Sequence, residues 1–317
     1  MKQPTTNISS EKISNSSLAQ RERLAYIEFR LFFLGDIRRQ DLMERFSVAP
    51  AAATRDFTLY REQCPDNIDF EGSRKTYILG KAFNPLFEHN IERVLLMLSR
   101  GFGDGIGQMQ DALLSCELPP VLNRPSADIL APVTRAIHQH KAVKMRYYSH
   151  SSGLSTREIV PFALANDGLR WHVRAFDRKS GEFRDFVFTR MESTQLLADS
   201  LLTKHELPEQ DHQWNRVVEL DIVAHPDRPQ PEIIERDYGM VNGVLHLKMR
   251  AAMAGYVLRQ WQVDCSSDHH IKDHGCRLWL RDVLALYGVN SAVLAQGYSV
   301  KNLKGMLPNQ LSPSVWK

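Results

Sequence analysis

The sequence lacks the apolar segments that would place it in a membrane. A membrane-spanning helix needs about 18 consecutive apolar residues, and no segment of the 317-residue chain approaches that length. The N-terminus also lacks the apolar core of a signal peptide, because residues 1–17 are rich in Ser, Asn and Thr. We therefore expect a cytoplasmic protein that has no membrane partner and begins with a disordered leader at residues 1–18.

Cysteine is scarce, and its spacing matches no standard metal site. The four cysteines are Cys64, Cys116, Cys265 and Cys276. No pair has C-x-x-C spacing, so free thiols in a reducing compartment are the simplest interpretation. His269, His270 and His274 lie between the last two cysteines. Zinc can use such ligands, but the spacing fits no known zinc motif, and we expect no bound metal.

Common catalytic motifs are missing as well. The chain has no Walker-type loop, no Gly-x-Gly-x-x-Gly after a strand, no His-Glu-x-x-His and no Gly-x-Ser-x-Gly. Residues 101–107 are rich in glycine, but they follow an expected helix rather than a strand, which favours a flexible linker over a phosphate-binding loop. We expect a protein that is not an enzyme, has no catalytic residues and needs no cofactor.

The formal net charge is only +3. Any surface that binds nucleic acid must therefore be local rather than a property of the whole chain. The most basic stretch is residues 141–190, with ten Lys or Arg against five Asp or Glu. The whole chain of 317 residues is too long for one ordinary domain and suits two or three.

The N-terminal part predicts three helices. Apolar residues recur at helical spacing over residues 21–34. Gly35 would end this helix, and Asp36 could cap a second helix that runs through Phe46. Pro50 suits the first position of a third helix that extends to about Arg61.

The second and third helices are separated by a short turn, which is typical of a helix-turn-helix. Residues 68–79 predict a hairpin with a basic tip at residues 72–75, so the order helix, helix, helix, hairpin indicates a winged helix. Periodicity alone leaves a three-helix packing module without a DNA role as the alternative. The side chains that would meet DNA are Arg38, Arg39, Ala51, Thr54, Arg55, Thr58, Ser73, Arg74 and Lys75.

Short extended runs dominate the central part of the chain. They cover residues 143–149, 157–165, 168–177 and 183–191, and Pro161 predicts an edge or a bulge in the second run. Residues 166–168 (Asn-Asp-Gly) form a strong hairpin signal. Short strands with tight turns in so few residues predict a small barrel.

One strand of this region carries charge on a single face. Apolar residues alternate over residues 169–175 with Arg170, His172 and Arg174. This pattern suits either a surface that receives an anion or a solvated outer face. The first interpretation predicts a pocket for a nucleotide or nucleic-acid effector. Its residues would be Tyr147, Ser149, Ser151, Ser152, His172, Arg174 and Arg190.

The same residues allow a competing hypothesis. His172 could act as a general base between arginines that hold charge, which would make the protein an RNA- or nucleotide-processing enzyme. Sequence spacing pairs His172 with no second histidine or carboxylate, so we prefer a binding pocket.

The last third of the chain has a mixed pattern. Beyond a polar connection at residues 192–213, strands and helices alternate and indicate a small α+β module.

The segment from Trp171 to Asp177 resembles the signature of WYL domains, with His-Val in place of the central Tyr-Leu. Tyr147-x-Ser149-x-Ser151-Ser152 and Phe186-x-Phe188-x-Arg190-Met191 stand where that family has its other motifs. The whole chain resembles the WYL transcriptional regulators of bacterial anti-phage systems, the BREX-associated and CBASS-associated repressors. One departure is Ala49, where the family tends to have a capping Ser or Thr.

The resemblance implies a multidomain α+β protein with an N-terminal winged helix-turn-helix, a small central Sm/SH3-like β-barrel and a C-terminal α+β dimerisation module. The expected boundaries are a leader at 1–18, a DNA-binding domain at 19–84, a helical linker at 85–127, a WYL domain at 128–200 and a C-terminal extension at 201–317. It also implies an autoregulating repressor of a phage-defence operon. Such a repressor would bind an inverted-repeat operator as a homodimer.

Overall fold

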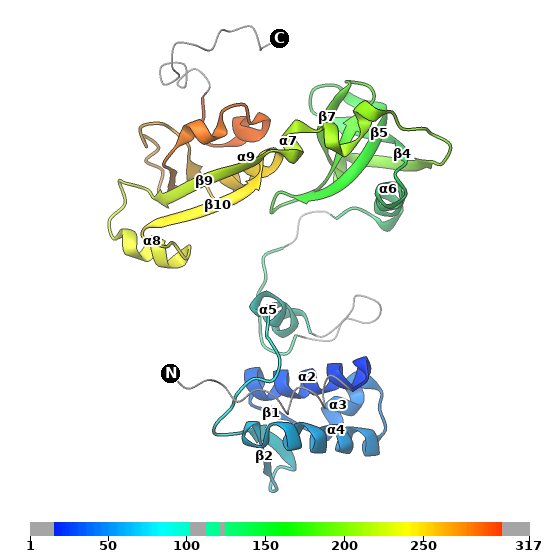
Figure 1. The fold of residues 1–317 in the computed structure, drawn as a ribbon, viewed down its shortest axis with the longest axis vertical. Helices are drawn as coiled ribbons and strands as arrows, with labels where there is room; N and C mark the ends of the chain where they lie inside the picture. Colours follow the sequence, from blue (N-terminus) through cyan, green and yellow to red (C-terminus); the bar gives the residue numbers. More distant parts are fainter. Residues whose placement is uncertain (1–15, 102–111, 121–123, 300–317) are drawn as a thin grey trace. The chain divides into compact units, whose positions relative to one another are not determined.

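The computed structural model describes residues 16–101, 112–120 and 124–299 (Figure 1). The chain forms two compact units, residues 1–119 and 120–317. Most of the expected leader, through residue 15, lies outside the described residues, as do residues 102–107 of the glycine-rich run. In the described part of the chain, no helix has the length and apolar character needed to cross a bilayer.

Three helices form the body of the first unit, as predicted. They are α2 (Leu18–Leu34), α3 (Arg39–Phe46) and α4 (Pro50–Gln63). Gly35 ends α2 in the left-handed conformation (φ 84°) that favours glycine, and Pro50 occupies the first turn of α4. Their apolar faces share one core, whose fully buried members include Leu24, Ile27, Leu31, Leu42, Ala53 and Tyr60.

The prediction that Asp36 caps the second helix is wrong. Asp36 begins the short strand β1 (Asp36–Ile37), where it pairs with Ile78 of β3. The helix starts three residues later, and the Asp41 side chain accepts a hydrogen bond from the backbone N–H of Arg38 at 2.7 Å. The wing therefore uses the backbone that the capping prediction had assigned to the helix.

The expected wing is present. After the turn η1 (Pro65–Asn67), strands β2 (Ile68–Glu71) and β3 (Thr76–Leu79) form a hairpin with an exposed tip at residues 72–75. With β1 they make a sheet of order β1-β3-β2. The next helix, α5 (Ile91–Arg100), begins where the Asn90 side chain caps it by accepting from the N–H of Arg93.

The second unit begins with α6 (Ala127–Gln139), which packs on an antiparallel five-stranded sheet. The strands are β4 (Ala142–Ser149), β5 (Gly153–Asn166), β6 (Trp171–Asp177), β7 (Glu182–Val187) and β8 (Met191–Leu197), with the turn η2 (Phe188–Arg190) before the last. A register shift between Pro161 and Ala163 confirms the predicted bulge. Val143, Met145, Ile159, Val173 and Ala175 are among the buried core residues.

Two expectations for this sheet need correction. Strand β8 occupies residues that were interpreted as a polar connection, and it pairs with β4 through Val143 and Leu196. The strand order is β7-β6-β5-β4-β8, with β7 and β8 at the two edges. Because no pairing joins these edges among the described strands, the sheet is open and the Sm/SH3-like barrel is not confirmed.

The C-terminal part of the second unit mixes helices and strands, as expected. Short turns η3 (Lys204–Glu206) and η4 (Pro208–Gln210) lead into α7 (His212–Asn215). A sheet of order β10-β9-β12-β11 follows, built from β9 (Val217–Ala224), β10 (Val244–Arg250), β11 (Val263–Asp264) and β12 (Leu278–Leu280). The remaining elements are α8 (Pro231–Asp237), α9 (Ala251–Gln260), η5 (Val283–Leu286) and η6 (Asn290–Leu294).

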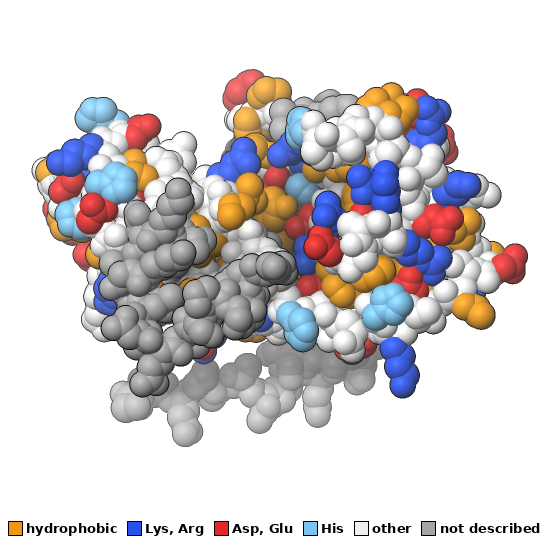
Figure 2. Space-filling model, turned by 90° about the horizontal axis from the view of Figure 1, so that it is seen from above, with side chains coloured by type: hydrophobic (Ala, Val, Ile, Leu, Met, Phe, Trp, Pro, Cys, Tyr) orange, Lys and Arg blue, Asp and Glu red, His pale blue; other side chains and the backbone are white. Residues whose placement is uncertain are grey.

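The core of this part lies between α9 and the sheet, where Leu220, Ile222, Leu258 and Leu280 are fully buried. Near the end of the described chain, residues 283–294 contain the two 3₁₀ turns η5 and η6. On the face seen in Figure 2, basic and acidic side chains are interspersed. This pattern agrees with the small net charge of the chain.

Candidate nucleic-acid interface and anion pocket

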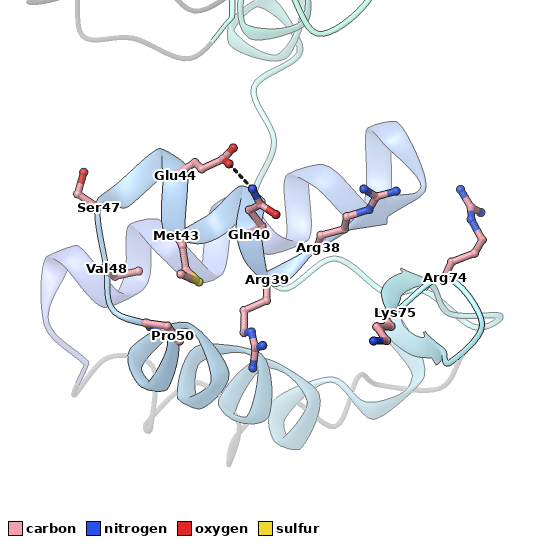
Figure 3. A pocket seen from close by; sticks show the side chains of 10 residues that line it. All are labelled: Arg38, Arg39, Gln40, Met43, Glu44, Ser47, Val48, Pro50, Arg74 and Lys75. Atoms are coloured by element: carbon pink, nitrogen blue, oxygen red, sulfur yellow. Dashed lines mark hydrogen bonds between the residues drawn. The ribbon is translucent and has the colours of Figure 1, made fainter.

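A groove of about 790 Å³ opens on the first unit between the start of α3, the turn to α4 and the tip of the wing (Figure 3). Its lining residues are Arg38, Arg39, Gln40, Met43, Glu44, Ser47, Val48, Pro50, Arg74 and Lys75. Four of them are cationic. The single carboxylate, Glu44, accepts a hydrogen bond from Gln40 at 2.7 Å. A groove of this composition suits the phosphate backbone of a nucleic acid.

The helix α4 leaves one face free beside this groove. Ala51, Thr54, Arg55 and Thr58 are all exposed, as the sequence predicted, whereas Ala53, Asp56, Phe57 and Tyr60 are buried on the opposite face. Among the described residues, Arg55 forms no ion pair and no hydrogen bond. A small side chain near the helix start and a free guanidinium one turn later are suited to approaching a base edge.

Arg39 links the groove to the exposed face of α4. Its NH1 group donates a hydrogen bond to Thr54 Oγ1 at 3.3 Å, and Figure 3 shows its side chain directed toward α4. At the wing tip, Arg74 forms ion pairs with Glu71 at 3.5 Å and Asp36 at 3.9 Å. The Ser73 hydroxyl also donates to Glu71, so it is engaged within the tip. The four cations therefore come from the start of α3 and from the tip of the wing, around one groove.

The buried face of α4 is fixed by both rings and charge. Phe57 stacks on Tyr77 of β3 with centroids 4.2 Å apart. The buried carboxylate of Asp56 pairs with Arg23 of α2 at 2.5 Å and accepts from Gln20 at 3.0 Å. Ala49 provides no side-chain cap, yet the helix still begins at Pro50 because these contacts hold it.

A second, smaller pocket of about 250 Å³ lies on the central sheet of the second unit. Its lining residues are Tyr147, Ser149, His150, Ser151, Arg157, Arg184, Asp185, Phe186 and Arg190. Four of the seven predicted ligand residues are among them: Tyr147, Ser149, Ser151 and Arg190. Ser152 is exposed in the adjoining turn but does not line the pocket.

Sequence reasoning missed Arg157 and Arg184, two of the three pocket arginines. The Arg157 side chain is 9% exposed and donates to Asp177 at 2.6 Å. Its Nε atom is buried and has no hydrogen-bond partner within the described ranges. Arg190 donates to His150 Nε2 at 2.9 Å, so His150 accepts at this atom. Three hydroxyls and three guanidinium groups, one of which has an unsatisfied donor, favour an anion with several oxygens.

His172 and Arg174 do not line this pocket, contrary to the prediction. Both are buried, at 5% and 6% exposure. His172 Nε2 lies 3.0 Å from Asp167 Oδ2, and its ring lies 5.4 Å from that of Tyr256 on α9. The alternation correctly indicates two faces of the strand. The second face, however, packs against the C-terminal part of the unit through Asp211 and Tyr256.

Arg174 is held between two carboxylates. It donates to Asp211 at 2.7 and 3.1 Å and pairs with Asp185 at 3.2 Å. Burial disfavours the charged form, but hydrogen bonding to Asp211 and the charge of Asp185 raise the pKa of Arg174 above its ordinary value. Asp211 in turn caps α7 by accepting from the N–H groups of Gln213 and Trp214. This arginine is thus an internal anchor between the sheet and the C-terminal part.

The same geometry bears on the enzyme hypothesis. The structure does pair His172 with a carboxylate, Asp167, which sequence spacing did not indicate. Burial opposes ionisation, yet backbone hydrogen bonds from Arg170 and Leu169, followed by the bond from His172, hold the pKa of Asp167 below its usual range. The pair is buried under Tyr256 and lies outside the pocket, so a base at His172 could not reach a substrate bound there.

Three family descriptions match separate parts of the chain. They are the BrxR transcriptional regulator winged helix-turn-helix domain at residues 19–100, the WYL domain at residues 128–196, and the BrxR transcriptional regulator C-terminal dimerization domain at residues 217–286. The chain is also 31% identical, over 261 residues, to the DNA-binding transcriptional repressor CapW of Escherichia coli strain KTE188. This alignment covers 79% of the chain and 85% of the relative.

The chain belongs to the CapW family. A CapW of Stenotrophomonas maltophilia is 31% identical over 253 residues, covering 77% of the chain and 84% of the relative. A CapW of Pseudomonas aeruginosa is 29% identical over 252 residues, covering 76% and 82%. The expected resemblance to WYL-domain repressors is therefore confirmed.

Among solved structures, the proteasome accessory factor PafBC of Arthrobacter aurescens aligns with a TM-score of 0.28 and 17% identity. The alignment covers 86% of this chain, which spans 46% of the length of that structure.

In this member of the CapW family, the groove lies inside the winged-helix match and the pocket inside the WYL match. The two candidate sites thus fall in different domains of the architecture.

The cysteine and histidine residues near the C-terminus lie outside both candidate sites. Cys265 and Cys276 are buried free thiols. Burial, with the charge of Asp264 as the next cause, raises the pKa of the Cys276 thiol to about 11, which keeps it protonated. In residues 16–101, 112–120 and 124–299, no cluster of His, Cys, Asp or Glu has the arrangement of a metal site.

Proposed function

We propose that this protein is a homodimeric, autoregulating repressor that binds inverted-repeat operator DNA of a phage-defence operon. One observation carries the proposal: the exposed face of α4 lies beside a groove with four cations. A winged-helix match and relatives named as DNA-binding transcriptional repressors support it.

In the proposed complex, α4 enters the major groove. Ala51 allows close approach, Thr54 and Thr58 line the interface, and Arg55 reads a base edge. The phosphate contacts come from side chains around the groove and at the wing tip, which fix the position of the helix without reading sequence. These are Arg38, Arg39, Ser73, Arg74 and Lys75.

Two copies of the chain together form the proposed operator-binding surface. The family description matched by residues 217–286 is that of a dimerization domain. A two-fold dimer presents two α4 helices, so its operator must contain two inverted half-sites. In helix-turn-helix dimers these half-sites are spaced by about one helical turn, roughly 10 base pairs, or a multiple of it.

The central pocket is proposed as the site of a phosphate-bearing effector, a nucleotide or a short nucleic acid. Its revised ligand set keeps Tyr147, Ser149, Ser151 and Arg190 and adds Arg157, whose Nε lacks a partner. Ser152 would meet only the part of a larger ligand that extends beyond the pocket. An effector that binds the DNA-free form more tightly must weaken operator binding by the same factor.

The pocket has a direct connection to the C-terminal part through Asp185. This pocket residue pairs with Arg174 and accepts from the Tyr256 hydroxyl at 3.1 Å. An anion that enters the pocket meets the Asp185 carboxylate as a like charge and competes for the guanidinium groups near it. We expect the effector to act by disturbing this connection.

A gel-shift assay on the DNA upstream of the gene tests the proposal. The double variant Thr54→Ala, Arg55→Ala should lose at least about tenfold in affinity, since one good base contact contributes about 1–3 kcal/mol. Arg61→Ala is the matched control, because Arg61 is an exposed arginine of the same helix that does not line the groove. Wild-type affinity in the double variant would contradict the proposed role of α4.

A further inference from the structure

Glu28 is a carboxylate in α2 with no exposed surface. It has four hydrogen-bond partners. Oε2 accepts from the Tyr60 hydroxyl at 2.9 Å and from the backbone N–H of Leu86 at 2.8 Å. Oε1 accepts from the N–H of Phe87 at 2.8 Å and lies 3.1 Å from His89 Nε2. A buried carboxylate is tolerated only with such a set of donors, so these groups are held together.

The donors belong to two different parts of the unit. Tyr60 lies in the last turns of α4, whereas the other three precede α5 in the segment 84–89. Asn67, at the base of the wing, extends the network. Its Nδ2 group donates to Tyr60 at 3.2 Å and to the Asn84 carbonyl at 2.8 Å, and its Oδ1 accepts from the Asn84 N–H at 2.8 Å.

Aromatic contacts hold the same segment against α2. Phe83 stacks on Phe32 with centroids 4.7 Å apart, and the His89 ring meets Phe33 edge-on at 5.2 Å. Asn90, the next residue, caps α5. The Glu28-bound segment therefore continues directly into α5.

We propose that Glu28 couples the position of α5 to the orientation of α4. Because Tyr60 and Leu86 share one carboxylate oxygen, the segment cannot move away without leaving a buried donor or acceptor unpaired. Glu28 is then a positioning residue for DNA binding, through which movement of the linker helix changes the operator-binding face. This inference rests on the proposed role of α4 as the recognition helix.

Hydrogen–deuterium exchange on the full-length protein tests the coupling. The segment 84–89 lies outside the candidate interface, yet saturating upstream DNA should slow exchange of the Leu86 and Phe87 amides by at least about fivefold, the lower end of typical coupling. Tyr60→Phe removes the hydroxyl that joins α4 to Glu28. In this variant the DNA should still bind, but the slowing should disappear.

Tyr77→Phe is the matched control. Its ring also packs on α4, but within the described part of the chain its hydroxyl forms no hydrogen bond, so the slowing should persist. The coupling is refuted if DNA slows exchange equally in Tyr60→Phe and wild type, or not at all in wild type.

A second variant covers the case in which Tyr60→Phe does not fold. His89→Ala alters a side chain that is 13% exposed, and operator affinity should fall at least about fivefold. Unchanged affinity would count against the coupling. Failure of the proposed function looks different, because Arg55→Ala would then keep wild-type affinity whatever the exchange data show.

Discussion

Asp185 accepts a hydrogen bond from the hydroxyl of Tyr256 at 3.1 Å, which joins the wall of the central pocket to α9. The two residues are far apart in sequence, and the second lies inside the match to the dimerization domain. Arg174 closes the arrangement by pairing with Asp185 and Asp211. A polar contact of this kind connects the candidate sensor to the part of the chain that is expected to form the dimer.

Removing the Tyr256 hydroxyl should have a small, defined effect on stability. Tyr256→Phe keeps the ring beside His172 and removes one hydrogen bond to a carboxylate, so the free energy of unfolding should fall by about 1.5–3 kcal/mol. Chemical denaturation measures it. Tyr238→Phe is the control, because its ring packs near Trp261 and within the described residues its hydroxyl has no hydrogen bond. Equal effects of both changes would contradict the assigned contact.

Arg174 and Arg190 should behave differently when each is replaced by alanine. Arg174→Ala leaves the carboxylates of Asp185 and Asp211 buried without their cation, which should cost about 3–5 kcal/mol of stability. Arg190→Ala removes a partly exposed pocket cation and should change stability by less than about 0.5 kcal/mol. Thermal unfolding distinguishes them. A stable Arg174→Ala protein would show that this arginine is not an internal anchor.

Asp167 predicts a loss of stability in acid. Because the folded-state pKa of Asp167 lies below its ordinary value of 3.8, its contribution is fully present above pH 3.8 and is lost as the pH falls through the lowered pKa. Asp167→Asn should therefore flatten the acid limb of the stability–pH curve. Unfolding curves between about pH 6 and 2 measure this. Parallel curves for wild type and variant would contradict the assignment.

Lys75 should contribute to DNA affinity without reading sequence. Replacing it with Gln removes one cation from the groove, so the slope of log affinity against log salt should become shallower by about 0.9. The preference for upstream over scrambled DNA should not change. Lys81→Gln is the control, since Lys81 is exposed but does not line the groove. An altered sequence preference in Lys75→Gln would argue against a phosphate contact.

The elements of the winged helix could be predicted because apolar spacing follows the buried faces of α2 and α4. The Asp36 cap failed because a distant strand, β3, pairs with its backbone. Strand β8 was missed because residues 192–195 are polar, and only its pairing with β4 defines it.

In the candidate sites, too, contacts between residues far apart in the sequence could not be predicted. The free face of α4 follows from helical periodicity, so its exposed residues were found correctly. His172 and Arg174 were predicted to line the pocket because alternation shows that β6 has two faces. It does not show what packs on each face. Arg157 could not be found from spacing, because its place in the pocket depends on how β5 pairs with β4, where it lies opposite Met145.

A hydroxyl-radical footprint of the full-length protein on its upstream DNA tests the central claim most directly. We predict two protected segments of inverted sequence, separated by about one helical turn or a multiple of it. Both should disappear together in the variant Thr54→Ala, Arg55→Ala at a concentration that saturates the wild type. Uniform protection, or a footprint that the double variant reproduces, would contradict a dimeric repressor that reads its operator through α4.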